Sequence, residues 1–192
     1  MDQPTPSPEN APQRLRLLRT KTFMPRAHPD LVPRARLLEA LDAEPGSKLV
    51  LVAAPAGFGK TALLCRWVET RSLPAVWLSL DERSNNPVNF VTRLAAALQE
   101  LCPAVKSPQV PTRDIAEDGI IQVINALADA PGDFVLILDN YQVIESPLVS
   151  RAMSLLLDYP PPHLHLIIAT QVEPSLPLSR LQVRRQLLRL RL

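Results

Sequence analysis

Short apolar runs that alternate with amphipathic segments constrain the fold of this chain more than any other feature of its sequence. Three of the runs are apolar almost throughout, as strands buried on both faces should be, and occupy residues 48–54, 75–80 and 134–139. A fourth run covers 165–170, and residues 186–192 alternate leucine with polar residues as a possible fifth strand.

Helical segments lie between these runs. A short amphipathic helix is expected around Leu37–Leu41, and longer helices are expected at about 60–71, 87–101, 115–130 and 147–159. Asn86-Pro87 has the composition of a helix start, with a capping residue followed by proline in the first turn. Because strands and helices alternate, the sequence predicts an α/β fold with a parallel sheet covered on both faces.

Composition narrows the class of protein. The chain has 192 residues, of which 46% are hydrophobic and 21% charged, which suffices for one core without a disulfide or a structural metal. A net charge of +2 is too small to argue for nucleic acid, and we expect no direct DNA contact from this segment.

No apolar run approaches the roughly 18 residues of a membrane span, and the polar N-terminus is unlike a secretory signal. We therefore expect a cytoplasmic protein that does not enter the membrane.

The N-terminal residues differ in composition from the rest. Residues 1–16 are rich in proline and polar side chains and are expected to form a disordered tail. Residues 17–192 are then expected to form a single domain.

The strongest chemical signal lies between the first expected strand and a helix that begins near Lys60. Glycines at 57 and 59 permit a tight loop whose backbone N–H groups point toward a chain of phosphates. Lys60 supplies a mobile positive charge for the outer phosphates, and the hydroxyl of Thr61 is a magnesium ligand in such loops. Ala54 replaces the first glycine of the usual pattern, but the position between strand and helix is the one that the motif requires. The predicted phosphate-binding loop consists of Ala54, Pro55, Ala56, Gly57, Phe58, Gly59, Lys60 and Thr61.

A second signal is Asp139, which ends a buried apolar run. In P-loop proteins a carboxylate at this position contacts the magnesium ion, directly or through water. An aspartate at the end of a strand can also simply cap the next turn. With the phosphate loop present, the magnesium role is favoured.

Taken in order along the chain, several motifs resemble one protein family. They are Arg19–Arg26, Leu31–Arg34 with Arg36-Leu37-Leu38, the loop Ala54–Thr61, Trp77–Glu82 with Asn86-Pro87, Leu138–Tyr141, and Leu176–Arg180 with Gln186–Leu188. This succession, over about residues 17–192, resembles the nucleotide-binding domain of the MalT-like, large ATP-binding LuxR-type transcriptional regulators. These are signal-transduction ATPases of the AAA-related P-loop superfamily.

The resemblance implies a three-layer P-loop NTPase sandwich, with about five parallel strands in the order 5-1-4-3-2. It implies that ATP, rather than GTP, binds together with Mg2+. It also places Val32 and Arg34 beside the adenine, although this segment could instead merely cover the edge of the sheet. The relatives continue into helical, sensor and helix-turn-helix domains that this sequence lacks, so other domains or subunits of a regulator are its expected partners.

The chain departs from the family pattern at two positions that bear on hydrolysis. Where the family has a second acid after the aspartate, this chain has Asn140, whose amide cannot accept a proton from water at neutral pH. Where the family has an arginine that senses the γ-phosphate, this chain has Gln171. Asp81 or Glu82 could replace the missing acid, although both residues could equally belong to a solvated turn.

Together these features predict a regulatory switch that binds ATP and ADP and is at most a weak ATPase. Two alternatives remain, a small P-loop phosphotransferase and an interaction module that has lost nucleotide binding. The intact Lys60, Thr61 and Asp139 argue against the second alternative.

Overall fold

The computed structural model describes residues 24–25, 34–42, 47–71, 73–106 and 115–192. The predicted tail, residues 1–16, and Val32 lie outside the described residues.

A five-stranded sheet forms the centre of the molecule, and every strand in it pairs in parallel with its neighbours. The strands are β1 (Leu49–Ala53), β2 (Ala75–Ser79), β3 (Phe134–Asp139), β4 (Leu164–Thr170) and β5 (Leu187–Arg191). Their order is β2-β3-β4-β1-β5, which is the expected order 5-1-4-3-2 read from the other edge. The predicted α/β class and strand order are therefore confirmed.

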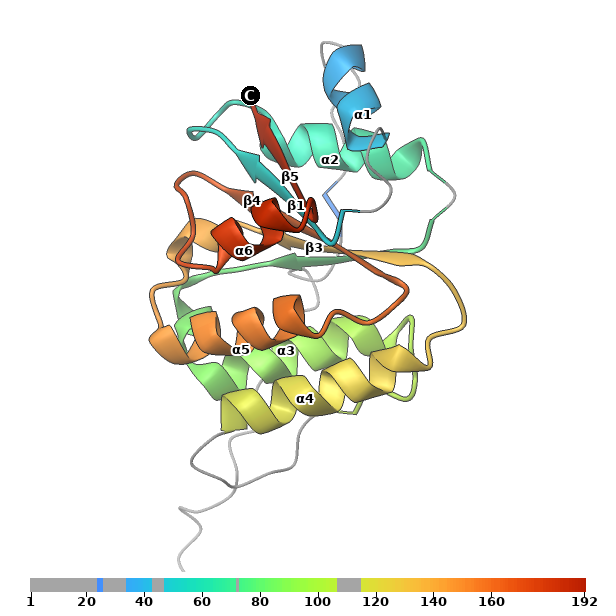
Figure 1. The fold of residues 1–192 in the computed structure, drawn as a ribbon, viewed down its shortest axis with the longest axis vertical. Coiled ribbons are helices and arrows are strands. Elements are labelled where there is room, and N and C mark those ends of the chain that lie inside the picture. Colours follow the sequence, from blue (N-terminus) through green and yellow to red (C-terminus); the bar gives the residue numbers. More distant parts are fainter. Residues whose placement is uncertain (1–23, 26–33, 43–46, 72, 107–114) are drawn as a thin grey trace, which may run out of the picture.

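Helices cover both faces of this sheet and give three layers (Figure 1). One face is covered by α1 (Ala35–Asp42) and α2 (Lys60–Glu69), and the other by α3 (Pro87–Gln99), α4 (Ile115–Ala128), α5 (Pro147–Asp158) and α6 (Leu178–Val183). The chain moves across the sheet in one direction through α2 and in the opposite direction through the later helices. Because crossovers between parallel strands are right-handed, reversing the direction places the helix on the opposite face.

Two apolar cores follow from this layering. The larger core packs α3, α4 and α5 against the sheet and contains Phe90, Leu94 and Leu136, each of which is fully buried. The smaller core packs α1 and α2 against the other face and contains Leu64 and Ile137. β3 contributes to both cores because all of its residues are buried, as its uninterrupted apolar run predicts.

Two short 3-10 helices follow β2 and β3 and were not expected from the sequence. They are η3 (Glu82–Asn85) and η4 (Tyr141–Val143). Segments of one turn have no periodicity that a sequence pattern can reveal.

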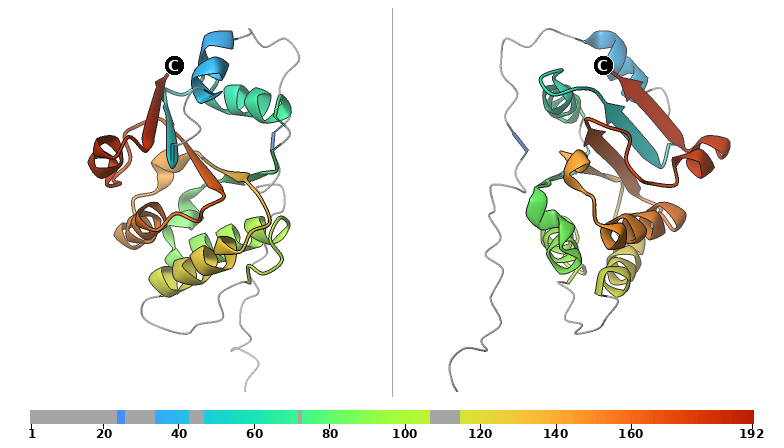
Figure 2. Two further views of the ribbon diagram at one scale, coloured as in Figure 1. Left: turned by 45° about the vertical axis from the view of Figure 1, so that its right-hand side comes forward. Right: turned by 90° about the vertical axis from the view of Figure 1, so that its left-hand side faces the viewer.

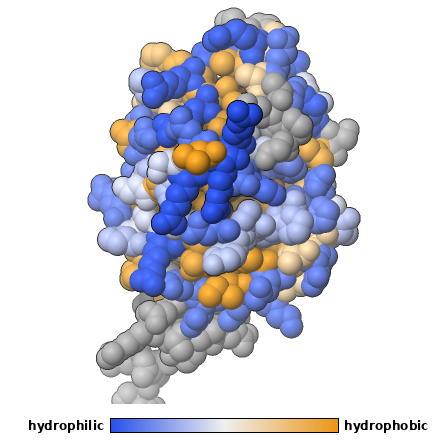
Figure 3. Space-filling model, viewed as in Figure 1, coloured by the Kyte–Doolittle hydropathy of each residue, from blue (hydrophilic) through white to orange (hydrophobic). Residues whose placement is uncertain are grey.

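The end of β5 lies beside α1 in every view of the ribbon (Figures 1 and 2). The surface seen in Figure 3 is mainly hydrophilic, with small and separate apolar areas. Among the described residues, no helix combines the length and the apolar character needed to cross a membrane.

Candidate functional site

The predicted phosphate loop connects the carboxyl end of β1 to the first residue of α2. Gly57 and Gly59 have φ angles of 79° and 77°, in the left-handed region that favours glycine. These two residues turn the chain from the strand into the helix within a short segment. The loop is largely exposed from Pro55 to Phe58.

The first turn of α2 is open to a ligand. Gly59 is its N-cap and offers no side chain, whereas α3 and α5 are capped by the side chains of Asn86 and Ser146. The first N–H groups of a helix have no partner within the helix, and the helix dipole favours an anion at this end. An anionic ligand can therefore replace the missing cap of α2.

Lys60 is folded over the loop that precedes it. Its Nζ donates hydrogen bonds to the carbonyl oxygens of Ala54, at 2.7 Å, and Pro55, at 3.0 Å. Lys60 is only 8% exposed, and these two hydrogen bonds hold its ammonium group against the start of the loop. A ligand with phosphate oxygens would compete with these two carbonyl groups for the lysine.

Thr61 and Asp139 meet across the edge of the sheet. The Thr61 hydroxyl donates to Asp139 Oδ2 at 3.0 Å, although the residues are 78 positions apart. Burial raises the pKa of the Asp139 carboxyl above its ordinary value, while hydrogen bonds from Thr61 and from the N–H of Asn140 act in the opposite direction. A hydroxyl and a carboxylate are hard oxygen ligands, and Mg2+ usually takes only one or two such groups from the protein. This pair therefore fits a magnesium ion that is completed by phosphate and water.

Asn140 occupies a constrained position directly after this carboxylate. Its φ of 61° lies in the left-handed region, which asparagine tolerates better than most residues. Its side-chain amide donates to the hydroxyl of Ser79 at 3.3 Å, so it bridges the ends of β3 and β2. The Asn140 amide is thus beside the predicted site.

Gln171 follows β4 at the same edge of the sheet. The N–H of Ala54, at the start of the loop, donates to the carbonyl of Thr170 at 3.2 Å. Because Gln171 directly follows Thr170, its backbone lies near the start of the loop. The side chain of Gln171 is exposed and carries no charge. Nothing at this position can replace the positive charge of an arginine.

Arg34 lies against the loop from the side of α1. A Cβ atom built on Gly59 would lie 3.7 Å from one guanidinium nitrogen of Arg34. Arg34 also lines an open pocket of about 590 Å3 beside the loop. The structure therefore brings Arg34, Lys60, Thr61, Asp139 and Asn140 to one edge of the sheet.

Asp81 is engaged by a partner that the sequence did not indicate. Arg93 NH1 donates to Asp81 Oδ1 at 2.8 Å and to the Ser84 hydroxyl at 2.9 Å, and Arg93 NH2 donates to the Ser79 carbonyl. Arg93 is only 9% exposed. Asp81 is therefore a structural residue at the end of β2 rather than part of a freely solvated turn. This role makes it a poor substitute for the missing acid.

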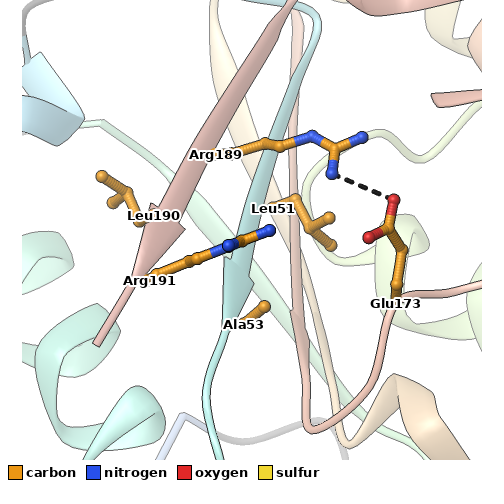
Figure 4. Close-up of a pocket in the computed structure, with 6 residues that line it drawn as sticks. All are labelled: Leu51, Ala53, Glu173, Arg189, Leu190 and Arg191. Carbon is orange, nitrogen blue, oxygen red and sulfur yellow. Dashed lines mark hydrogen bonds and ion pairs between the residues drawn. The ribbon is translucent and has the colours of Figure 1, made fainter. Parts of the chain in front are cut away.

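A smaller cavity, of about 150 Å3, lies between β1, β5 and the loop after β4 (Figure 4). The side chains of Arg189 and Arg191 extend in parallel from β5 across Leu51 and Ala53 (Figure 4). Arg189 pairs with Glu173 at 2.9 Å, which links β5 to the segment that follows Gln171. Arg189 and Arg191 thus line this cavity, and Arg191 also lines the larger pocket beside Arg34.

The sequence of this chain is similar to part of the MalT transcriptional regulators. The chain is 34% identical, over 162 residues and 82% of its length, to the HTH-type transcriptional regulator MalT of Cronobacter sakazakii. It is 32% identical, over 179 residues and 91% of its length, to the MalT regulator of Yersinia enterocolitica. The matches cover 18% and 20% of these regulators, so the chain spans about a fifth of the relatives. No protein-family model matches the chain.

Solved structures resemble the fold at low sequence identity. The chain overlays Cdc6p from Pyrobaculum aerophilum with a TM-score of 0.56 and 16% identity, over 84% of this chain and 47% of that one. It overlays a chain from the structure of Drosophila ORC bound to DNA with a TM-score of 0.54 and 12% identity, over 81% of this chain and 87% of that one. Such likeness concerns the fold alone. The chain is therefore a MalT-like domain with a P-loop ATPase fold, and it belongs to the family of the MalT transcriptional regulators.

Proposed function

We propose that this chain is the ATP-binding switch module of a MalT-like, LuxR-type signal-transduction regulator, and that it binds Mg-ATP and hydrolyses it slowly or not at all. The observation that carries the proposal is the convergence of Lys60, Thr61 and Asp139 on the uncapped N-terminus of α2. Lysine, threonine hydroxyl and carboxylate are the three groups that hold the phosphates and the magnesium ion in P-loop proteins.

The roles of the groups follow from their chemistry. The loop N–H groups and Lys60 would hold the phosphate chain, and Thr61 and Asp139 would hold magnesium. When bound, the ion neutralises charge on the outer phosphates. Lys60 would leave the carbonyls of Ala54 and Pro55 when the phosphates arrive, because a phosphate oxygen carries more negative charge than a carbonyl.

Slow hydrolysis follows from the neighbouring side chains. Asn140 has no group that can remove a proton from water, and Gln171 offers no positive charge to the transferred phosphoryl group. The bound γ-phosphate would then persist. The difference between ATP and ADP would favour one arrangement of the module against the other parts of the regulator.

A nucleotide titration with and without Mg2+, followed by a phosphate-release assay, tests the proposal. We expect saturable binding of ATP and ADP, stronger with Mg2+, and phosphate release close to background. Lys60→Ala should reduce the affinity at least tenfold, because it removes the only side-chain cation that the loop itself carries. Phosphate transfer that depends on an added acceptor would indicate a phosphotransferase instead, and no binding by the unmodified chain would indicate an interaction module.

A further inference from the structure

Phe58 is an unusual residue for the tip of a phosphate loop. It is 48% exposed, although a large aromatic side chain normally buries most of its surface. It also lines the pocket of about 590 Å3 beside the loop, so its ring borders a concave surface rather than open solvent. A ligand in this pocket would cover the exposed ring.

Three separate segments form the pocket. Arg34 directly precedes α1 and Leu37 lies in its first turn, the loop supplies Phe58, and Arg191 and Leu192 lie at the end of β5 and just after it. The volume lies within the range of about 300–1,000 Å3 that is usual for small-molecule sites. Leucine side chains and an aromatic ring give the pocket an apolar lining of the kind that receives a flat ring system.

The charges of the pocket indicate the class of ligand. Arg34, Arg36 and Arg191 line it, and no acidic residue is among its described lining residues. Arg34 lies beside Gly59, next to the phosphate loop. An apolar lining next to several guanidinium groups suits a ligand that joins an aromatic ring to an anionic chain.

We propose that the Phe58 ring stacks on the base of ATP, in the pocket that also contains Arg34, the residue that the family resemblance places beside the adenine. This inference rests on the proposed function, because it assumes that the phosphate loop binds the triphosphate. It extends that function by giving the loop two tasks. The backbone and Lys60 hold the phosphates, and the Phe58 ring stacks on the base.

The experiment compares three ligands, ATP, ADP and inorganic triphosphate, by calorimetric titration in the presence of Mg2+. For Phe58→Ser we expect the affinities for ATP and ADP to fall by the same factor, between about 5-fold and 100-fold, because a lost aromatic stack is worth this much per base. The affinity for inorganic triphosphate should stay within twofold of the unmodified chain. Phe58→Tyr should restore the affinity for ATP.

Leu148→Ser is the matched control. Leu148 is 52% exposed on α5, so this variant also removes a large exposed apolar side chain, but away from the loop. It should leave all three affinities unchanged. Circular dichroism of each variant checks that the fold is retained.

The outcomes separate this inference from the proposed function. If the unmodified chain binds neither ATP nor triphosphate, the proposed function fails and this inference fails with it. If the unmodified chain binds ATP but Phe58→Ser binds it equally well, only the role of Phe58 is wrong. A loss of ATP and triphosphate affinity by the same factor in Phe58→Ser would also overturn it, because Phe58 would then shape the loop rather than contact the base.

Discussion

At the scale of single residues, Asn140 combines a backbone constraint with a chemical one. Its left-handed conformation and its bond to Ser79 hold the side chain at the ends of β3 and β2. Aspartate also tolerates this conformation, and a carboxylate here could accept a hydrogen bond from the Ser79 hydroxyl. The geometry therefore permits the substitution that would supply a base.

Asn140→Asp should raise ATP turnover on the order of tenfold, because a carboxylate can accept the proton of attacking water whereas an amide cannot. The gain should stay below the full effect of a general base because Gln171 still lacks a positive charge. A single-turnover phosphate-release assay measures the change, with Asn140→Ala as the control that should show no gain. Fast hydrolysis by the unmodified chain would contradict the slow-switch interpretation.

Asp139 is a second residue whose burial has a measurable consequence. Its pKa is raised, chiefly by burial, so the ionised carboxylate lowers the stability of the folded chain at neutral pH. This loss disappears as the pH falls through the raised pKa and the group takes up a proton. A buried carboxylate that is placed to bind a cation is thus expected to lower the stability of the fold when the cation is absent.

Asp139→Asn should therefore raise the melting temperature of the nucleotide-free chain at pH 7. The difference between the variant and the unmodified chain should shrink as the pH is lowered from 7 toward about 4, the ordinary carboxyl range. Thermal melts across this range measure it. In Asp139→Asn, Mg2+ should no longer increase the affinity for ATP. If Asp139→Asn is less stable than the unmodified chain at pH 7, the assigned cost of burying the carboxylate is wrong.

At the scale of elements, short connections after β2 and β3 build the edge of the sheet that carries the site. Asn86 and Ser146 cap α3 and α5, and each is followed by proline in the first turn. Asn85 joins the two connections. Its amide nitrogen donates to the Val143 carbonyl at 2.6 Å, and its Oδ1 accepts from the N–H groups of Glu145 and Ser146.

Asn85→Ala should lower the free energy of unfolding by about 1–3 kcal/mol, because it leaves three backbone groups without their partner. Urea denaturation measures this value. Asn89→Ala is a suitable control, since within the described part of the chain the Asn89 side chain makes one hydrogen bond, to the Arg83 carbonyl at 3.3 Å in an exposed position. The control should change stability by less than about 0.5 kcal/mol. Equal losses in the two variants would mean that the Asn85 bridge has no special role.

At the scale of the whole molecule, a ligand at the proposed site would connect elements that belong to the two cores. The phosphate loop starts from β1, an interior strand between β4 and β5, and leads into α2 on one face. Asp139 ends β3, whose residues pack into the cores on both faces. A ligand that contacts both positions binds only the folded chain, because these residues are far apart in the sequence.

Mg-ATP at about 100 times its dissociation constant should therefore stabilise the fold by about 2.7 kcal/mol. For a chain of this size the melting temperature should rise by roughly 5–11 °C. Differential scanning fluorimetry measures the shift, and Lys60→Ala should reduce it to about half or less at the same ligand concentration, because its affinity is expected to be at least tenfold lower. An unchanged shift in Lys60→Ala would place the nucleotide elsewhere.

Local sequence patterns predict which helices and strands form and the order in which they follow one another. Apolar runs such as Phe134–Asp139 predict buried strands because a strand covered on both faces needs apolar residues at every position. Asn86-Pro87 predicts a helix start because capping is a local interaction. The resemblance to a regulator family supplied the strand order, which the structure confirms.

Contacts between residues that are far apart in the sequence depend on how the elements pack. The bond from Thr61 to Asp139, the bridge made by Asn85 and the pairing of Asp81 with Arg93 join segments whose approach depends on the packing of the sheet. No local pattern encodes these contacts, because side-chain periodicity describes only which face of an element is buried. The same reason explains why the position of Phe58 beside Leu37 and Leu192 became visible only in three dimensions.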